Sequence, residues 1–502
     1  MKKIISVLMI FALLMLSACA KEAEPVDTAP APTSAPQISG DPAIDQTDYR
    51  SVVLDQFNTI PEAVASDFTY TVGENGVTID SYLGSGELLR LPETIEGKPV
   101  IGISDGAFAV IVEDEENEGN EGNEGNEGEP PIGLSNHEPA KKTLLKALYI
   151  PDSVTQIGVG VLSGCNTLVA LRTPFMAQTA TAESQFLGYL FGGQSHTENT
   201  KAPSSLLYVC LGDALTSLPA SAFSDCDHLV AVLLGDRISK IGDFSFYFCK
   251  NLKYVNMDRL TQIGEYAFAN CPVLVRVNLS TSCISIGLGA FQGCGSVSSM
   301  VLPFVGNTAT QNGYLGYIFG AKHVEFTAGY IPAYLRRITL LDTCTVLHNN
   351  AFFECSSLTS VTLPNTLTEI GIRAFEGCDK LPSITLPASL RTIRENAFVG
   401  CTGLERVAIG EGLTSIGINA FYNCTALREI YLPTSLTSLP ASAFANCVAM
   451  HTVSLGGVTS VGKNAFRNCN SVAGVITTQS VSFESGNNCV SKYLGIDSNE
   501  KK

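Results

Sequence analysis

Apolar and polar residues alternate along this chain in a phrase that returns every 22 or 23 residues over most of its length. In residues 358–378, Val361 and Leu363 alternate with serine and threonine, which predicts a short strand with one buried side. A proline ends the strand, further apolar positions follow, and the pair Ala374 and Phe375 comes near the end of the phrase. A period in the twenties is typical of a solenoid, in which each turn buries its apolar side chains against its neighbours.

The phrase closes on Ala-Phe-x-x-Cys or a close variant. A looser first copy ends at Cys165, and the others end at Cys226, Cys249, Cys271, Cys294, Cys355, Cys378, Cys401, Cys424, Cys447 and Cys469. Aligned on this motif, the inward strand residues begin at Leu89 and Leu91 and end near Val475. We therefore expect a stack of about fifteen turns, with like residues above one another and parallel strands along one side.

Two jumps of 61 residues interrupt the spacing, one after Cys165 and one after Cys294. Both contain the same inserted module, with Pro-Phe, Thr-Ala-Thr and Leu-Gly-Tyr-x-Phe-Gly at matched places, in the extended turns 174–207 and 303–336. Insertions in solenoids emerge on one face and often serve recognition. The alternative, which we favour, is a structural unit whose aromatic residues pack on the side opposite the strands, namely Tyr189, Phe191, Tyr317 and Phe319.

The complete phrase, Leu-x-x-Val-x-Leu-Pro-x-x-Leu-Thr-x-Ile-Gly-x-x-Ala-Phe-x-x-Cys, resembles the BspA-type leucine-rich repeat over about residues 85–480. The resemblance implies an α/β-type repeat solenoid with a parallel β-sheet on one face and short helices or turns on the other. It also implies an extracytoplasmic protein without catalytic chemistry, active in adhesion, coaggregation or cell-surface contact. Residues 68–108 are similar to the strand-rich entry of such arrays. We assign 49–88 to a strand-rich N-terminal cap, 89–480 to the solenoid and 481–502 to a polar C-terminal tail.

The first residues predict export and a lipid anchor. A basic start and a short apolar run make residues 1–18 a signal peptide, and the run is too short for a permanent membrane-spanning helix. Leu16 to Cys19 resembles the bacterial lipobox, which implies cleavage before Cys19 and attachment of lipid to its sulfur. An ordinary signal peptide with an incidental cysteine is the alternative. Residues 19–48 are rich in proline, alanine and acidic residues and predict a disordered tether.

The net charge of −17 is concentrated in the acidic stretch 113–131, which predicts a solvated, disordered insertion in the solenoid. Calcium binding is the sharper interpretation of this stretch, but the alternating ligands of a calcium loop are missing. An acidic chain also argues against nucleic acid as a partner.

Candidate catalytic and metal-binding motifs are weak in this sequence. No Cys-x-x-Cys pair occurs, and the six histidines have no metal-ligand spacing, so we expect neither a metal nor a cofactor. Cysteines stacked one turn apart are separated by about 4.8 Å, which is wide for a disulfide, and we interpret those of the repeat as buried thiols. Four cysteines lie outside the repeat spacing, and whether they form disulfides is left open: Cys210, Cys283, Cys344 and Cys489. We expect Cys210 to be the most exposed of them.

Two matches to enzyme motifs fall inside repeat phrases. Gly102 to Gly106 reads Gly-x-Ser-x-Gly, and Gly457 to Lys463 is spaced like a phosphate-binding loop but is followed by Asn464 instead of serine or threonine. Neither lies in the strand-to-helix context that its chemistry needs. The sequence therefore predicts that the protein is not an enzyme.

The outward strand positions are the candidate binding surface, because aromatic and arginine side chains are enriched at the energetic centres of protein contacts. They are Tyr149, Arg172, Tyr208, Tyr254, Asn256, Arg276, Asn278, Arg337, Arg406 and Tyr431. We predict a lipid-anchored cell-surface protein that binds an extracellular protein or glycan. A structural component of the envelope without a dedicated ligand is the alternative.

Overall fold

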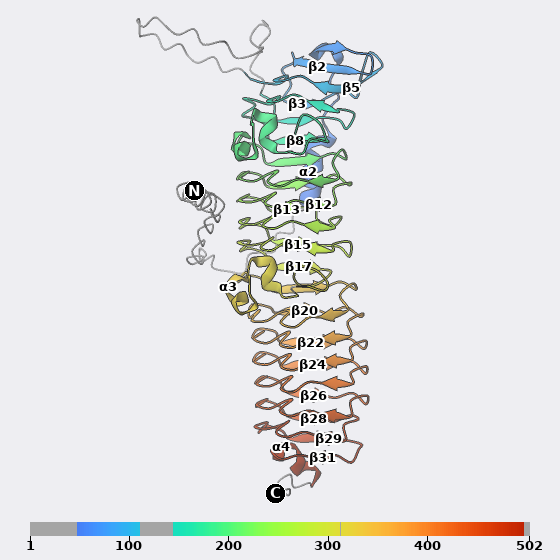
Figure 1. Cartoon of the computed structure of the whole chain (residues 1–502), viewed down its shortest axis with the longest axis vertical. Helices are drawn as coiled ribbons and strands as arrows, with labels where there is room; N and C mark the ends of the chain where they lie inside the picture. The colour runs from blue at the N-terminus through green and yellow to red at the C-terminus, as the bar shows by residue number, and fades with distance from the viewer. Residues whose placement is uncertain (1–47, 111–143, 312, 496–502) are drawn as a thin grey trace, which may run out of the picture. The chain divides into compact units, whose positions relative to one another are not determined.

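The computed structural model describes residues 48–110, 144–311 and 313–495, all of which fall within one compact unit (Figure 1). The predicted signal peptide 1–18, the lipid-attachment residue Cys19, almost all of the tether 19–48 and the acidic insertion 113–131 lie outside the described residues. These assignments therefore stay predictions.

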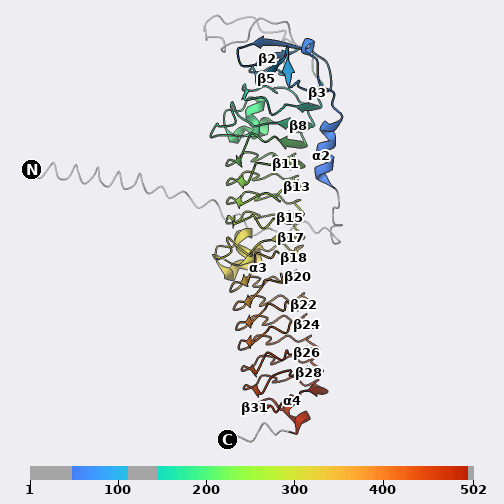
Figure 2. The ribbon, with the colours of Figure 1, turned by 90° about the vertical axis from the view of Figure 1, so that its right-hand side faces the viewer.

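Short parallel strands stack one per turn along one side of the solenoid, as the alternating pattern predicts (Figures 1 and 2). Hydrogen bonds join them in groups of six, four and five. We call the surface made by their outward side chains the strand face. Its strands are β3 (Leu88–Arg90), β6 (Ala147–Tyr149), β8 (Ala170–Thr173), β9 (Tyr208–Leu211), β11 (Ala231–Leu233), β13 (Tyr254–Val255), β15 (Arg276–Asn278), β17 (Ser299–Leu302), β18 (Arg337–Leu340), β20 (Ser360–Thr362), β22 (Ser383–Leu386), β24 (Arg406–Ile409), β26 (Glu429–Tyr431), β28 (Thr452–Ser454) and β30 (Gly474–Ile476).

A second series of two-residue strands forms where each turn reaches its Leu-Thr-x-Ile-Gly segment. These strands are β7 (Gln156–Ile157), β10 (Ser217–Leu218), β12 (Lys240–Ile241), β14 (Gln262–Ile263), β16 (Ser285–Ile286), β19 (Val346–Leu347), β21 (Glu369–Ile370), β23 (Thr392–Ile393), β25 (Ser415–Ile416), β27 (Ser438–Leu439), β29 (Ser460–Val461) and β31 (Ser482–Phe483). The N-terminal cap adds η1 (Ala65–Asp67), β1 (Phe68–Val72) and β2 (Val77–Tyr82), and the first part of the solenoid adds β4 (Thr94–Ile95) and β5 (Lys98–Ile103). Strands β1 and β2 pair antiparallel. Strand β5 pairs in parallel with β2 on one side and with β7 on the other.

The core is a continuous column of apolar side chains, within which the phenylalanines of the repeated motif stack ring upon ring. The Phe398 ring centroid lies 4.9 Å from those of Phe375 and Phe421, with 3° between the ring planes in both pairs. All three side chains are completely buried. The alternation of inward and outward residues is thus confirmed, and each turn depends on its neighbours to keep its aromatic ring from water.

The cysteines of the repeat have a role beyond filling space. Most donate their thiol hydrogen to the carbonyl oxygen of the phenylalanine one turn earlier; the Sγ–O distance is 3.1 Å from Cys401 to Phe375 and 3.2 Å from Cys424 to Phe398. Every described cysteine is a free thiol. Burial raises the pKa of these thiols, so they stay protonated and able to donate.

The two extended turns fold as the packing alternative predicts. The first contains η2 (Leu187–Phe191) and η3 (His196–Lys201), and the second contains η4 (Leu315–Phe319), η5 (Val324–Phe326) and α3 (Thr327–Tyr330). Phe191 and Phe319 are buried in the main core, and Tyr189 and Tyr317 pack against it. Outside these two turns and the ends of the array, the side opposite the strands consists of turns.

The start of the described chain differs from the assignment made on sequence. Residues 49–58, which we placed in a strand-rich cap, form helix α2 (Tyr49–Asn58); the Asp48 side chain caps it by accepting a hydrogen bond from the Ser51 backbone N–H. The segment 481–502, which we assigned to a polar C-terminal tail, contains α4 (Asn488–Ser491) and η6 (Lys492–Leu494). Two buried residues, Val53 and Phe57, are too short a pattern to identify α2 from sequence.

Candidate functional site

The strand face has two parts of different composition. From β6 to β13 its outward positions include Ala147, Ala170, Ala231 and Leu233, with tyrosines between them. From β15 onward they are mainly serine, threonine and arginine. The first part is therefore an apolar strip, which is unusual on a surface unless another element covers it.

Helix α2 is that covering element, and it packs lengthwise over strands β6 to β13 (Figure 2). Val53 and Phe57 are buried against the apolar strip. At one end the Tyr49 ring stacks on Tyr254 with 6.2 Å between centroids, and at the other Phe57 meets Tyr149 edge to face at 6.3 Å. The chain thus occupies the first part of its own candidate binding surface.

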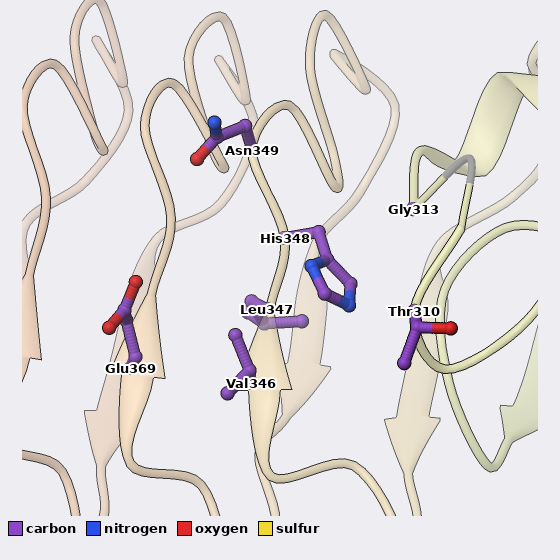
Figure 3. A pocket seen from close by; sticks show the side chains of 7 residues that line it. All are labelled: Thr310, Gly313, Val346, Leu347, His348, Asn349 and Glu369. Carbon is purple, nitrogen blue, oxygen red and sulfur yellow. The ribbon is translucent and has the colours of Figure 1, made fainter.

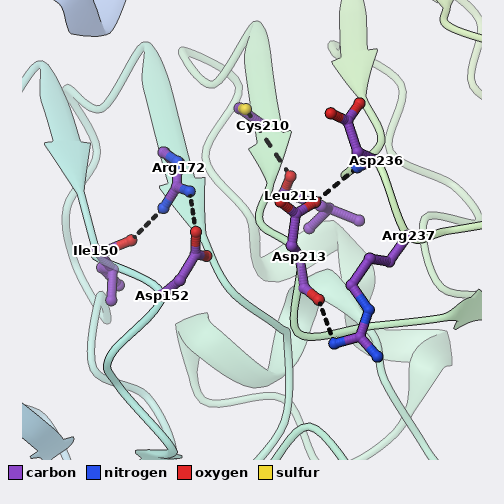
Figure 4. A network of polar contacts seen from close by, with 8 residues as sticks. All are labelled: Ile150, Asp152, Arg172, Cys210, Leu211, Asp213, Asp236 and Arg237. Carbon is purple, nitrogen blue, oxygen red and sulfur yellow. Dashed lines mark hydrogen bonds and ion pairs between the residues drawn. The ribbon is translucent and has the colours of Figure 1, made fainter.

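Arg172 and Tyr149, both predicted as binding residues, are engaged within the protein. The Arg172 guanidinium donates to the Ile150 carbonyl at 2.8 Å and to the Asp152 carboxylate at 2.6 Å (Figure 4). It also lies 4.4 Å from the centre of the Tyr149 ring, and Arg90 lies 4.3 Å from the same ring. Two cations over one ring, with a carboxylate beside them, stabilise the register of neighbouring turns.

Tyr208, Tyr254 and Asn256 are also in contact with other parts of the chain. Both tyrosines are half-buried beneath α2. The Asn256 side chain is buried, accepts from the Leu234 backbone N–H at 2.7 Å and donates to the Leu234 carbonyl at 3.0 Å. Cys210, which we expected to be the most exposed thiol, is half-buried beside α2, and burial raises its pKa to about 11. Sequence reasoning missed these contacts because their partners lie in other turns.

The remaining predicted residues are exposed on the second part of the strand face, from β15 to β30, which we call the open strand face. They are Arg276, Asn278, Arg337, Arg406 and Tyr431. The strand register aligns Arg276 with Ser299 and Ser299 with Arg337, so the two arginines lie two strands apart, or about 10 Å. Arg406 aligns with Glu429, whose carboxylate accepts from the Tyr431 hydroxyl at 3.3 Å.

A small polar pocket lies between the second extended turn and the two-residue strands β19 and β21 (Figure 3). It is lined by Thr310, Gly313, Val346, Leu347, His348, Asn349 and Glu369. One ring nitrogen of His348 is hydrogen-bonded to the Ala309 carbonyl, and the Asn349 side chain accepts from the Ile372 backbone N–H at 2.8 Å. The His348 and Asn349 side chains of this pocket therefore already form hydrogen bonds with neighbouring turns.

The described residues offer little for catalysis or metal binding. Ser104 of the Gly-x-Ser-x-Gly match donates its hydroxyl hydrogen to Asp80 at 2.9 Å, and among the described residues no histidine is hydrogen-bonded to it. The same part of the chain holds no group of three or more histidine, cysteine or acidic side chains placed to bind a metal. None of its helices has the length and apolar character to span a membrane.

Comparison with protein families identifies one match. The model described as "BspA type Leucine rich repeat region" matches residues 198–314 and 334–491, with 6 copies. These ranges make up more than half of the chain and lie within the repeat stack. No curated protein matches the sequence.

Solved structures with similar features include leucine-rich proteins from several bacteria. A leucine-rich cell-surface protein from Faecalibacterium prausnitzii is 19% identical, with 88% of this chain and 98% of that chain covered and a TM-score of 0.30. A leucine-rich repeat protein from Bacteroides ovatus is 18% identical, with 84% and 99% covered and a TM-score of 0.30. The pneumococcal vaccine antigen PcpA is 18% identical, with 83% and 93% covered and a TM-score of 0.29.

Proposed function

This chain belongs to the BspA-type leucine-rich repeat family, and from that premise we propose that it is a lipid-anchored, non-catalytic protein of the bacterial cell surface. In this proposal it binds an extracellular macromolecule, protein or glycan, through the open strand face. The family membership, the resemblance of Leu16 to Cys19 to a lipobox and the exposed outward residues from β15 onward support it. Adhesion or cell-surface contact is the biological role that such binding would serve.

The observation that carries the proposal is the placement of three exposed arginines on one rigid surface. Arg276, Arg337 and Arg406 point outward from β15, β18 and β24, and none forms an ion pair with another described residue. Guanidinium groups that are exposed and have no ion-pair partner in the described chain are available to a ligand. Guanidinium groups bind carboxylates and sulfates in two-point contacts, so the ligand we propose carries acidic groups.

The rigidity of the array makes a repeated weak contact effective. Strands β18 and β24 pair in parallel with both neighbours and β15 pairs with β17, so the arginines are spaced before the ligand arrives and little conformational entropy is lost on binding. An arginine at the centre of an interface contributes roughly 1–2 kcal/mol when truncation to alanine is measured. Loss of all three should therefore weaken binding by more than about a hundredfold.

The test is a binding screen of the mature protein against immobilised matrix proteins and acidic glycans. A saturable ligand from the screen is then titrated with the triple variant Arg276→Ala, Arg337→Ala, Arg406→Ala. A matched triple that removes the same charge away from the strand face is the control: Arg259→Ala, Arg394→Ala, Arg467→Ala. Loss of binding in the first variant alone supports the proposal, and equal loss in both refutes a site on the open strand face. Absence of any ligand together with envelope defects in a deletion strain would favour the structural role instead.

The lipid anchor is tested separately. Replacement of Cys19 by serine removes the sulfur that lipid would modify, so the protein should move from the detergent phase to the aqueous phase on phase partitioning. Labelling with a radioactive fatty acid should be lost at the same time. Unchanged partitioning of the Cys19→Ser variant would refute the proposed lipid anchor.

A further inference from the structure

Each turn places two residues in the left-handed region of backbone space, on the side opposite the strand face. The first follows the Ile-Gly pair by two positions, and the second immediately precedes the repeat cysteine. We call the series of first residues the left-handed ladder. Its members are mostly asparagine, serine or glycine, such as Asn350, Asn396, Asn419 and Asn464, with φ between 56° and 63°. These residue types tolerate positive φ at the lowest cost.

Two consecutive turns break this rule with aromatic residues. Phe244 has φ of 57° and Tyr266 has φ of 52° on the left-handed ladder, and Phe248 has φ of 59° at the second position. A bulky side chain in this region is strained relative to its ordinary conformation. Such strain persists where the side chain serves another purpose than folding.

The aromatic side chains of these turns form an exposed cluster. The Phe244 ring stacks on the Tyr266 ring with 5.3 Å between centroids and 12° between planes, and it meets Tyr247 edge to face at 5.5 Å. The Phe244 side chain is 40% exposed. Tyr266 covers one face of the Phe244 ring, and the ladder residue of the preceding turn, on the other side, is the small Ser221.

Several carboxylates lie in the turns that hold this ring. Asp225 lies in the preceding turn, and its charge contributes to the raised pKa of Tyr247, after burial of the phenol. Asp243 and Glu265 directly precede Phe244 and Tyr266 in sequence and are exposed. The nearby cation Lys250 is already paired with Asp227 at 2.7 Å. An electron-rich ring face beside acidic groups attracts a cation, and does so more strongly than either feature alone.

On this side of the solenoid the chain already holds one guanidinium against an aromatic ring and a carboxylate. Further along the left-handed ladder stands Arg373, whose guanidinium lies 4.5 Å from the centre of the Phe353 ring. The same guanidinium donates to Glu376 at 2.7 Å and 3.0 Å. Phe353 lies one turn before Arg373 and corresponds to Tyr247, so Arg373 stands at the ladder position that Tyr266 occupies after Tyr247. The turns of this surface therefore bind a guanidinium between an aromatic ring and a carboxylate where the sequence supplies one.

We propose that Phe244, Tyr247 and Asp225 form a binding site for an arginine side chain of another protein. The guanidinium stacks on the open face of Phe244, with the edge of Tyr247 beside it and the Asp225 carboxylate accepting its hydrogen bonds. The site lies away from the strand face, so it is independent of the function proposed above.

The experiment uses the mature protein and a fluorescent tetra-arginine peptide, with binding followed by anisotropy. A peptide with citrulline in place of arginine is the matched neutral probe. The variant Phe244→Asn removes the ring, keeps the net charge and installs the residue that other turns use at this position. We expect binding of the arginine peptide at least tenfold weaker than in the parent protein, with an unfolding midpoint that is unchanged or higher. We also expect the citrulline peptide to bind the parent at least tenfold more weakly than the arginine peptide.

A second variant, Asp225→Asn, keeps the rings and a residue type that tolerates its φ of 60°, and should weaken arginine binding severalfold. The control Asn396→Ser alters the same ladder position in another turn and should leave binding unchanged. Equal affinity of the parent and Phe244→Asn for the arginine peptide would overturn the proposal, since general attraction to an acidic protein would then explain the binding. A lower unfolding midpoint in Phe244→Asn would also overturn it, because the rings would then serve the fold. Binding of a neutral oligosaccharide in place of the peptide would have the same consequence.

Discussion

Replacement of Phe398 by leucine tests whether the ring column stabilises the array beyond simple burial. The side chain is completely buried, and its ring stacks on two others at 4.9 Å. Leucine keeps most of the apolar volume but loses both stacks, each worth about 0.5–1.5 kcal/mol, and leaves a small cavity. We expect a loss of about 2–4 kcal/mol in the free energy of unfolding.

Phe466 supplies the internal comparison, because it is also fully buried but stacks on one described ring only, that of Phe444, at 5.5 Å. The same substitution there loses one stack instead of two. Phe466→Leu should therefore cost about 1 kcal/mol less than Phe398→Leu.

The assay is urea denaturation combined with hydrogen exchange, because a repeat array can unfold in sections and a single transition would not be decisive. In Phe398→Leu the amides of residues 375–424 should lose protection first, and in Phe466→Leu the loss should be confined to the C-terminal turns. Equal costs for the two variants would show that burial alone, without stacking, accounts for the choice of phenylalanine.

Three further predictions concern the thiols. Cys401→Ala removes the thiol donor from the Phe375 carbonyl, which keeps the Cys378 backbone N–H as its other donor at 3.1 Å, and should lower the free energy of unfolding by about 0.5–1.5 kcal/mol. Cys401→Ser, which can still donate, should lose less when both are measured by urea denaturation. Burial raises the pKa of the thiols above 9.0, so the folded state holds protons that the unfolded chain releases. Stability should therefore be constant below about pH 8 and fall as the pH rises through about 9 to 11. A thermal midpoint that stays flat over this range would contradict the burial argument. Phe57→Ala should loosen α2 and speed alkylation of Cys210 about tenfold, whereas Leu54→Ala, at an exposed position of the same helix, should not.

The repeat phrase was sufficient to predict the stack, because the residues of each turn indicate locally which of its side chains point inward. An inward residue such as Val361 or Phe375 is recognisable from its immediate neighbours, and copies of one phrase can only bury their apolar side by lying upon each other. The same regularity indicated that the cysteines are buried. That they donate to a phenylalanine carbonyl required the structure, because the acceptor is in the preceding turn.

The availability of the candidate binding residues was decided by tertiary structure alone. Sequence indicates which side chains point outward, since that depends on alternation along a single strand. Whether an outward side chain meets water depends on what else reaches it, and α2 crosses strands that follow it by about 90 to 200 residues. For the same reason Tyr254 is covered and Arg276, one turn later, is open. A helix with two buried residues has no periodic signature, so only the folded chain shows where it rests.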